Sequence, residues 1–201
     1  MNSKFFSAKN IALLGVLIAL VIVLQLFASA IPMFGVTLNF SLIPIALAGI
    51  LLGVWGGTIV GLTCGLVLFI TTAVLGQEPS TAFLFQTNPV ILSLVCIGKT
   101  TLAGLVSGIL YKLIAKANGF LAVTVGAIVI PIVNTGIYML GMVLMKQSVA
   151  DFLSLDSASA GVVFVGVFAL IWLNFVLEIA ITTIFTPLIH RVLKAINRSR
   201  G

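Results

Sequence analysis

Charged residues are scarce in this 201-residue chain, at 7%, whereas hydrophobic residues make up 61%. So few charges cannot cover the surface of a globule that faces water. A water-soluble globular protein is therefore excluded, because lipid must be the main solvent of the folded chain. The composition predicts an integral membrane protein.

Ionisable residues suited to catalysis are few. The acidic residues are Glu78, Asp151, Asp156 and Glu178, and the one histidine is His190. The sequence contains no HExxH or GxSxG motif and no pair of carboxylates on one helix face, so we assign no catalytic residue and no metal site. We expect no enzyme activity and no cofactor, and we place His190 at the level of the lipid headgroups.

Two further absences narrow the function classes. No Walker A motif is present, so the chain does not itself hydrolyse ATP. The two cysteines, Cys64 and Cys96, lie inside apolar runs, where we expect small core residues rather than a disulfide or a metal pair. A transporter, a binding subunit and a structural membrane protein remain.

Alternation of apolar and polar residues, the pattern of a membrane β-barrel strand, is also absent. The run IALLGVLIALVIVLQLF from Ile11 to Phe27 has no polar alternate position. Because about 20 apolar residues span a bilayer, we expect an all-α integral membrane protein, a bundle of six transmembrane helices in a single domain, residues 1–201. The expected spans are residues 10–31, 40–54, 57–76, 88–115, 120–146 and 161–190.

Basic residues set the expected orientation, because cytoplasmic loops are enriched in Lys and Arg. One basic cluster precedes the first span, one ends the fourth and one follows the sixth, so six crossings place all three on one side. Both termini are therefore expected to be cytoplasmic. The net charge of +6 is then a topology signal and a contact with lipid headgroups rather than a nucleic-acid site. The clusters are Lys4 with Lys9, Lys112 with Lys116, and Arg191 with Lys194, Arg198 and Arg200.

Glycines recur at a spacing of four residues in two places. The first row crosses the GVWGG segment from Gly53 to Gly57, where we expect a tight turn between the second and third spans, and the second row is Gly104 with Gly108. Small residues at this spacing let helices in lipid approach closely. We therefore expect tight packing inside the bundle. The first row is Gly49, Gly53, Gly57, Gly61 and Gly65.

The first span has a row of small residues of its own. Ala8, Ala12, Gly15 and Ala19 are spaced by four, three and four residues, which places them on one helix face. A flat face on an end helix can dock another protein, and packing inside the bundle explains the spacing equally well.

The segment LAGILLGVWGGTIVGLTCG, residues 47–65, and the segment TNPVI from Thr87 to Ile91 resemble a known family. They are similar to the substrate-binding S components of energy-coupling factor (ECF) transporters, and TNPVI is similar to the pantothenate-type members. The resemblance implies a multi-pass protein of the bacterial plasma membrane that captures a small water-soluble vitamin. It also implies a transmembrane T component, contacted through an Ala-xxx-Ala face such as Ala8 and Ala12, and two cytoplasmic ATPases.

On this resemblance the binding site lies toward the outer ends of the helices. We expect Asn39, Gln86 and Asn88 to bind polar atoms of the ligand, and Phe40 and Phe85 to supply stacking surface.

Deeper polar residues extend the predicted site. Asn134, Asn174 and Glu178 lie within apolar spans, and Asn174 and Glu178 are four residues apart on one face. A polar side chain in hydrocarbon needs a partner or a cavity. These residues therefore either bind the ligand or hold helices together.

Lys99 lies near the middle of the fourth predicted span. It follows Asn88 by 11 residues, about 16 Å along a helix axis. A bare ammonium at this depth is costly, so we expect it to pair either with Glu178 or with an anionic group of the ligand. Two other functions stay open: a secondary transporter coupled to protons through Glu178, and a structural assembly subunit of the membrane.

Overall fold

Helices make up nearly all of the computed structural model, which describes residues 7–30, 39–156 and 158–198. No strand occurs in these ranges. Lys4 and Arg200, two of the predicted basic residues, lie outside them. The elements are α1 (Ala8–Ala30), α2 (Leu42–Leu51), α3 (Gly53–Leu68), the π-helix η1 (Phe69–Val74), α4 (Pro79–Thr87), α5 (Pro89–Ile114), α6 (Gly119–Leu144), α7 (Lys146–Leu153) and α8 (Ala160–Arg198).

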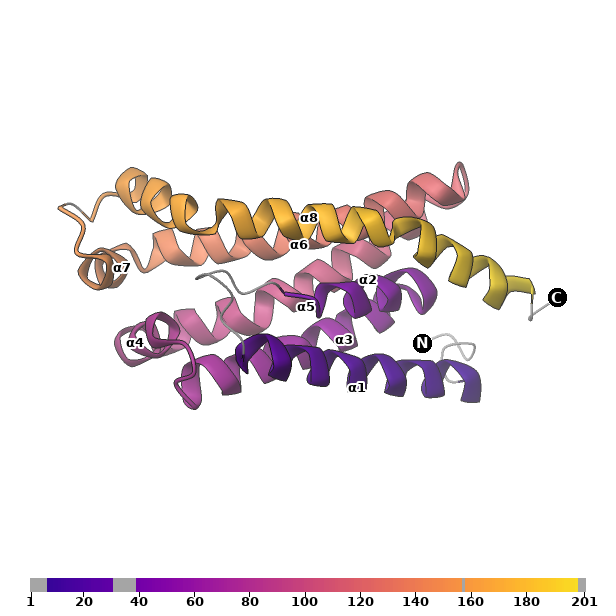
Figure 1. The fold of residues 1–201 in the computed structure, drawn as a ribbon, viewed down its shortest axis with the longest axis horizontal. Helices are drawn as coiled ribbons and strands as arrows, with labels where there is room; N and C mark the ends of the chain where they lie inside the picture. The colour runs from indigo at the N-terminus through magenta and orange to yellow at the C-terminus, as the bar shows by residue number, and fades with distance from the viewer. Residues whose placement is uncertain (1–6, 31–38, 157, 199–201) are drawn as a thin grey trace.

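The long helices α1, α3, α5, α6 and α8 run along the long axis of the molecule (Figure 1). The short helices α4 and α7 lie at one end, and α1 begins and α8 ends at the other (Figure 1). Within these described ranges, five segments are long and apolar enough to cross a membrane: Ala8–Phe27, Gly53–Val74, Pro89–Ile114, Gly119–Leu144 and Ala160–Leu193. The helical prediction is confirmed for the described residues, and the side of the membrane that each end faces stays a prediction.

The second predicted span, residues 40–54, is shorter than expected. Its helix α2 has 10 residues, about 15 Å, which is half of a hydrocarbon core about 30 Å thick. The predicted tight turn to α3 is confirmed at Gly53, whose φ of +76° is a conformation that side chains with a Cβ atom rarely adopt. The structure thus has five full-length apolar helices and one half-length helix where six spans were predicted.

The connections at one end contain helices that the apolar pattern did not reveal. Both α4 and α5 begin with proline, at Pro79 and Pro89, because the first turn of a helix does not need that N–H group. Asn88 separates them with a backbone φ of −139° and ψ of +63°, outside the helical region. The nine residues of α4 and the eight of α7 are too short and too polar to be found as spans.

The glycine rows hold α3 directly against α5. A Cβ atom added at Gly57 or Gly104 would overlap the backbone of the other glycine, and one added at Gly61 would overlap Thr100. The Thr100 hydroxyl group donates a hydrogen bond of 2.8 Å across this contact to the Gly61 carbonyl oxygen. The predicted tight packing is confirmed, because only residues without side chains permit this approach.

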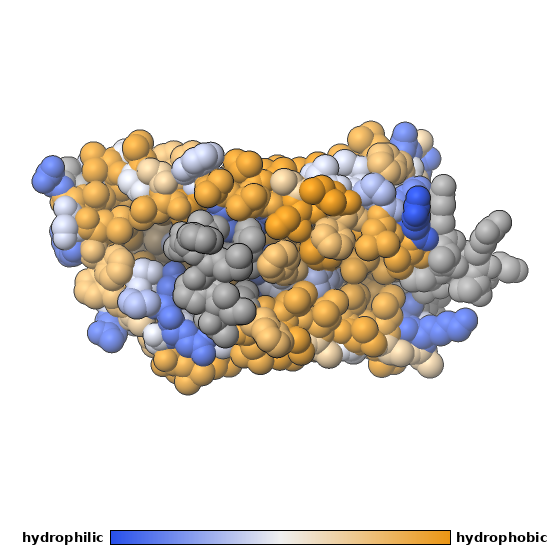
Figure 2. Space-filling view, in the orientation of Figure 1, coloured by the Kyte–Doolittle hydropathy of each residue, from blue (hydrophilic) through white to orange (hydrophobic). Residues whose placement is uncertain are grey.

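Large apolar side chains cover the outside of the bundle. Val90, Leu94 and Ile184 are about 70% exposed, each with an exposed fraction between 69% and 73%. Apolar residues dominate the visible face, and hydrophilic residues gather toward the two ends (Figure 2). This surface suits a lipid environment, in which exposed apolar side chains cost no free energy.

Candidate functional site

A cavity of about 570 Å³ lies inside the half of the bundle that α4 and α7 cover. Eight of the nine described helical elements, all except α2, contribute to its wall together with the loop residues Asn39, Gln77 and Glu78, so no single stretch of sequence defines it. Its polar lining consists of Gln25, Asn39, Thr72, Gln77, Glu78, Ser80, Thr81, Lys99, Asn134, Thr135, Tyr138, Asn174 and Glu178.

The helices α5, α6 and α8 each turn one stripe of side chains into the cavity. On α5 the stripe includes Leu92, Cys96 and Lys99, and on α6 it includes Asn134 and Tyr138. These spacings of three and four residues place the side chains of each helix on one face. The lining therefore follows from helical periodicity once the orientation of each helix is fixed.

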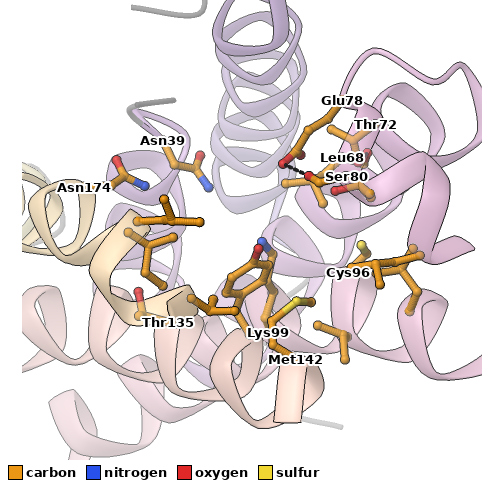
Figure 3. A pocket seen from close by; sticks show the side chains of 18 of the residues that line it. Asn39, Leu68, Thr72, Glu78, Ser80, Cys96, Lys99, Thr135, Met142 and Asn174 are labelled. Atoms are coloured by element: carbon orange, nitrogen blue, oxygen red, sulfur yellow. Dashed lines mark hydrogen bonds between the residues drawn. The ribbon is translucent and has the colours of Figure 1, made fainter. Parts of the chain in front are cut away.

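Lys99 projects into the cavity between two polar groups of residues (Figure 3). Asn39 and Asn174 form one group, and Thr72, Glu78 and Ser80 form the other. Its Nζ atom lies 5.0 Å from the centroid of the Tyr138 ring, a cation–π contact that partly compensates the ammonium group. In the described part of the chain, Lys99 forms no ion pair and no hydrogen bond. The predicted pairing with Glu178 is not formed in this structure, although both residues line the same cavity.

Glu178, Asn174 and Asn134, which line the same cavity, present unpaired acceptor atoms. The Asn174 amide donates to Glu178 Oε1 at 3.4 Å, as their shared face predicts. Among the described atoms, Glu178 Oε2 and the Oδ1 atoms of Asn174 and Asn134 are buried without a hydrogen-bond partner. A buried acceptor left unpaired costs about 1–3 kcal/mol, so these atoms favour a partner that enters the cavity.

Asn39 belongs to a polar cluster at the start of α2. The Ser41 hydroxyl group donates to Gln25 Oε1 at 2.9 Å, and Asn39 Oδ1 is a second acceptor for the same hydroxyl. The Cys64 thiol donates to Ser41 Oγ at 3.4 Å. Both cysteines are free and buried, as predicted. The cluster connects α1, α2 and α3 where the cavity begins.

The α4 end of the cavity has polar residues that sequence reasoning missed. The Ser80 hydroxyl group donates to Glu78 Oε1 at 2.9 Å, and Thr72 of η1 lies nearby (Figure 3). Gln25 and Tyr138 were also missed. Gln25 is the only amide in the apolar run of α1, and Tyr138 lies one helical turn after Asn134, so both had a detectable signal.

The other four predicted ligand residues do not line the cavity. Phe40 is 42% exposed and Gln86 is exposed. The Phe85 ring packs edge-on against Phe69, with centroids 5.3 Å apart. The Asn88 amide donates to Ser148 at 2.6 Å. Phe85 and Gln86 belong to α4, whose residues at the cavity are Pro79, Ser80, Thr81 and Leu84 instead.

The small-residue row of α1 lies on the outside of the bundle. Ala8, Ala12, Gly15 and Ala19 are all exposed, and a Cβ atom added at Gly15 would have no neighbour within 4 Å. The face of α1 that packs inward contains the buried residue Leu17 instead. Of the two explanations for this row, packing inside the described bundle does not hold.

The fold and the cavity together define a class: a multi-pass helical membrane protein that can enclose a small polar solute. The family model of the ECF transporter, substrate-specific component, matches residues 9–190. The chain therefore belongs to this family, whose members are substrate-binding subunits of transporters. No curated protein and no solved structure matches the chain.

Proposed function

We propose that the chain is the S component that captures a small water-soluble vitamin or micronutrient in this cavity. It delivers the solute inward together with a T component and two cytoplasmic ATPases, in the bacterial plasma membrane. The observation that supports this proposal most directly is the cavity, whose volume of about 570 Å³ is within the usual range for small-molecule sites. Pantothenate is the first candidate, because of the TNPVI segment.

The exposed small-residue face of α1 is the proposed contact for the T component. Ala8, Ala12, Gly15 and Ala19 offer a flat surface on which the partner helix approaches closely. In lipid such contacts rest on van der Waals packing, so the absence of large side chains favours association.

Mass spectrometry of small molecules released from the purified protein tests the capture function. We expect a vitamin-sized polar compound in stoichiometric amount, and renewed binding after its removal. A protein that is consistently empty, and that binds no compound from a metabolite extract, would favour the structural assembly subunit instead.

Glu178 supports a second candidate, a proton-coupled secondary transporter, because it is 4% exposed and lies beside a cavity. Transport assays separate the two functions. For an S component, uptake stops when the partner ATPases are inactivated, while binding to the purified chain persists. Transport by the chain alone in ATP-free vesicles, driven by a proton gradient, would establish the second candidate.

A further inference from the structure

Two chemically different sets of unpaired groups line the cavity. On α5, Lys99 offers three N–H donors and a positive charge, with an aromatic face as its only partner among the described residues. On α6 and α8, three buried oxygen atoms lack a donor: Asn134 Oδ1, Asn174 Oδ1 and Glu178 Oε2. Donors without acceptors and acceptors without donors thus line the same cavity.

We propose that the solute bound here carries an anionic group, such as a carboxylate, against Lys99 and N–H or O–H donors against Asn134, Asn174 and Glu178. This inference rests on the proposed function, and it adds the charge and polarity of the solute. A molecule of this kind pairs the Lys99 ammonium group and the three unpaired acceptor atoms at once.

The environment of Lys99 explains why the anionic group is required. Solute binding removes water from the ammonium group, and the Tyr138 ring at 5.0 Å only partly replaces it. Glu178 is not within ion-pair distance, and its Oε1 atom already accepts from the Asn174 amide. A neutral or cationic group at this position would leave a buried charge unpaired.

Binding of matched compounds to the purified protein tests the anionic group. The probes are pantothenate and panthenol, nicotinate and nicotinamide, and biotin and its primary amide, in which only the first member of each pair has a carboxylate. We expect one acid to bind at least about 30-fold more tightly than its neutral counterpart, the loss typical of an unpaired buried charge.

Four variants test which residues cause the tighter binding of the acid. Lys99→Met should make the acid and its neutral counterpart bind equally, and Lys99→Arg should keep the preference. Glu178→Gln should weaken the binding of both members of the pantothenate pair, and of the biotin pair, by the same factor, because both members share the N–H or O–H donors that the proposal places against Glu178. The matched control is Lys112→Met, an identical change on the exposed last turn of α5, which should alter neither affinity.

The melting temperature of the empty protein excludes a merely structural role for Lys99. It should stay unchanged in Lys99→Met; a lower value together with equal losses for acid and neutral compound would overturn the inference. Equal affinity of the wild type for both members of a pair would also overturn it, while leaving the capture function intact.

Incubation of the protein with a metabolite extract tests solutes other than the six probe compounds. If the protein retains only a compound from the extract, an anionic compound supports the inference and a neutral or cationic one contradicts it. If the wild type retains none of the probe compounds and nothing from the extract, the proposed function itself fails.

Discussion

At the scale of single residues, a buried polar cluster around Ser41 lies where the cavity begins. Ser41 is fully buried, and it links Gln25 on α1 with Cys64 on α3. In a medium without water, these groups must find their hydrogen-bond partners within the protein. The cluster therefore fixes how α1 and α2 meet at the boundary of the cavity.

Ser41→Ala should lower the free energy of unfolding by about 1–3 kcal/mol, because Gln25 Oε1 loses the hydroxyl group that donates to it. Thermal unfolding in detergent measures the change. Ser93→Ala is the control, since that hydroxyl donates only to the Pro89 carbonyl oxygen of its own helix. Equal effects of the two substitutions would show that the buried cluster does not stabilise the fold.

At the scale of helices, close contact and lateral exposure are decided by where small residues lie. Gly57 and Gly104 bring α3 and α5 into backbone contact, whereas Gly98 on the same helix α5 has no neighbour within 4 Å of an added Cβ atom. The same residue type is therefore essential at one position of a helix and replaceable at another.

Gly104→Ala should destabilise the protein by about 1–3 kcal/mol or more, because the added methyl group overlaps the Gly57 carbonyl and the backbones must separate. Gly98→Ala is the matched control, and its better helix propensity should leave stability unchanged or raise it by up to about 1 kcal/mol. Melting curves of the two variants measure this difference in stability. A stable Gly104→Ala protein would mean that α3 and α5 are not in backbone contact.

Ala12→Trp should abolish uptake, and the double variant with Gly15→Trp should do so more completely, because the rings hold a partner helix away from α1. Solute binding to the purified chain should be unchanged, since neither residue lines the cavity. The control is Val165→Trp, which adds the same ring to an exposed position of α8. Unimpaired uptake by the double variant would place the coupling surface elsewhere.

At the scale of the whole molecule, the two ends differ in charge and in construction. The end at which α1 begins and α8 ends also contains Lys112 and Lys116, and the opposite end contains α4, α7 and the cavity they cover (Figure 1). Basic residues favour the cytoplasmic side, so the cavity should open toward the outside.

Thiol labelling of intact cells tests this orientation. We expect a membrane-impermeant maleimide to modify Gln147→Cys on α7, and to modify Lys112→Cys on α5 only after the cells are permeabilised. The wild-type chain is the background control, because Cys64 and Cys96 are buried. Labelling in the reverse order would invert the predicted topology.

The sequence by itself determined the long apolar helices and the tight packing at the glycine rows, whereas the structure showed that these rows join α3 to α5. Apolar runs of this length form helices because lipid offers the backbone no hydrogen-bond partners, and the glycine rows fit only tight packing. Asn134, Asn174 and Glu178 were also identifiable, since a polar group within an apolar run requires a partner.

Only the tertiary structure decided which faces point inward. α1 is apolar on nearly all sides, and lipid is as apolar as the protein interior, so periodicity cannot separate a core face from a lipid face. The exposure of Ala12 and the turn of Phe85 away from the cavity depend on contacts with distant segments. For the same reason, the sequence could not show whether Lys99 pairs with Glu178 or with the ligand. In the structure, the packing of α5 against α6 places Lys99 over the Tyr138 ring.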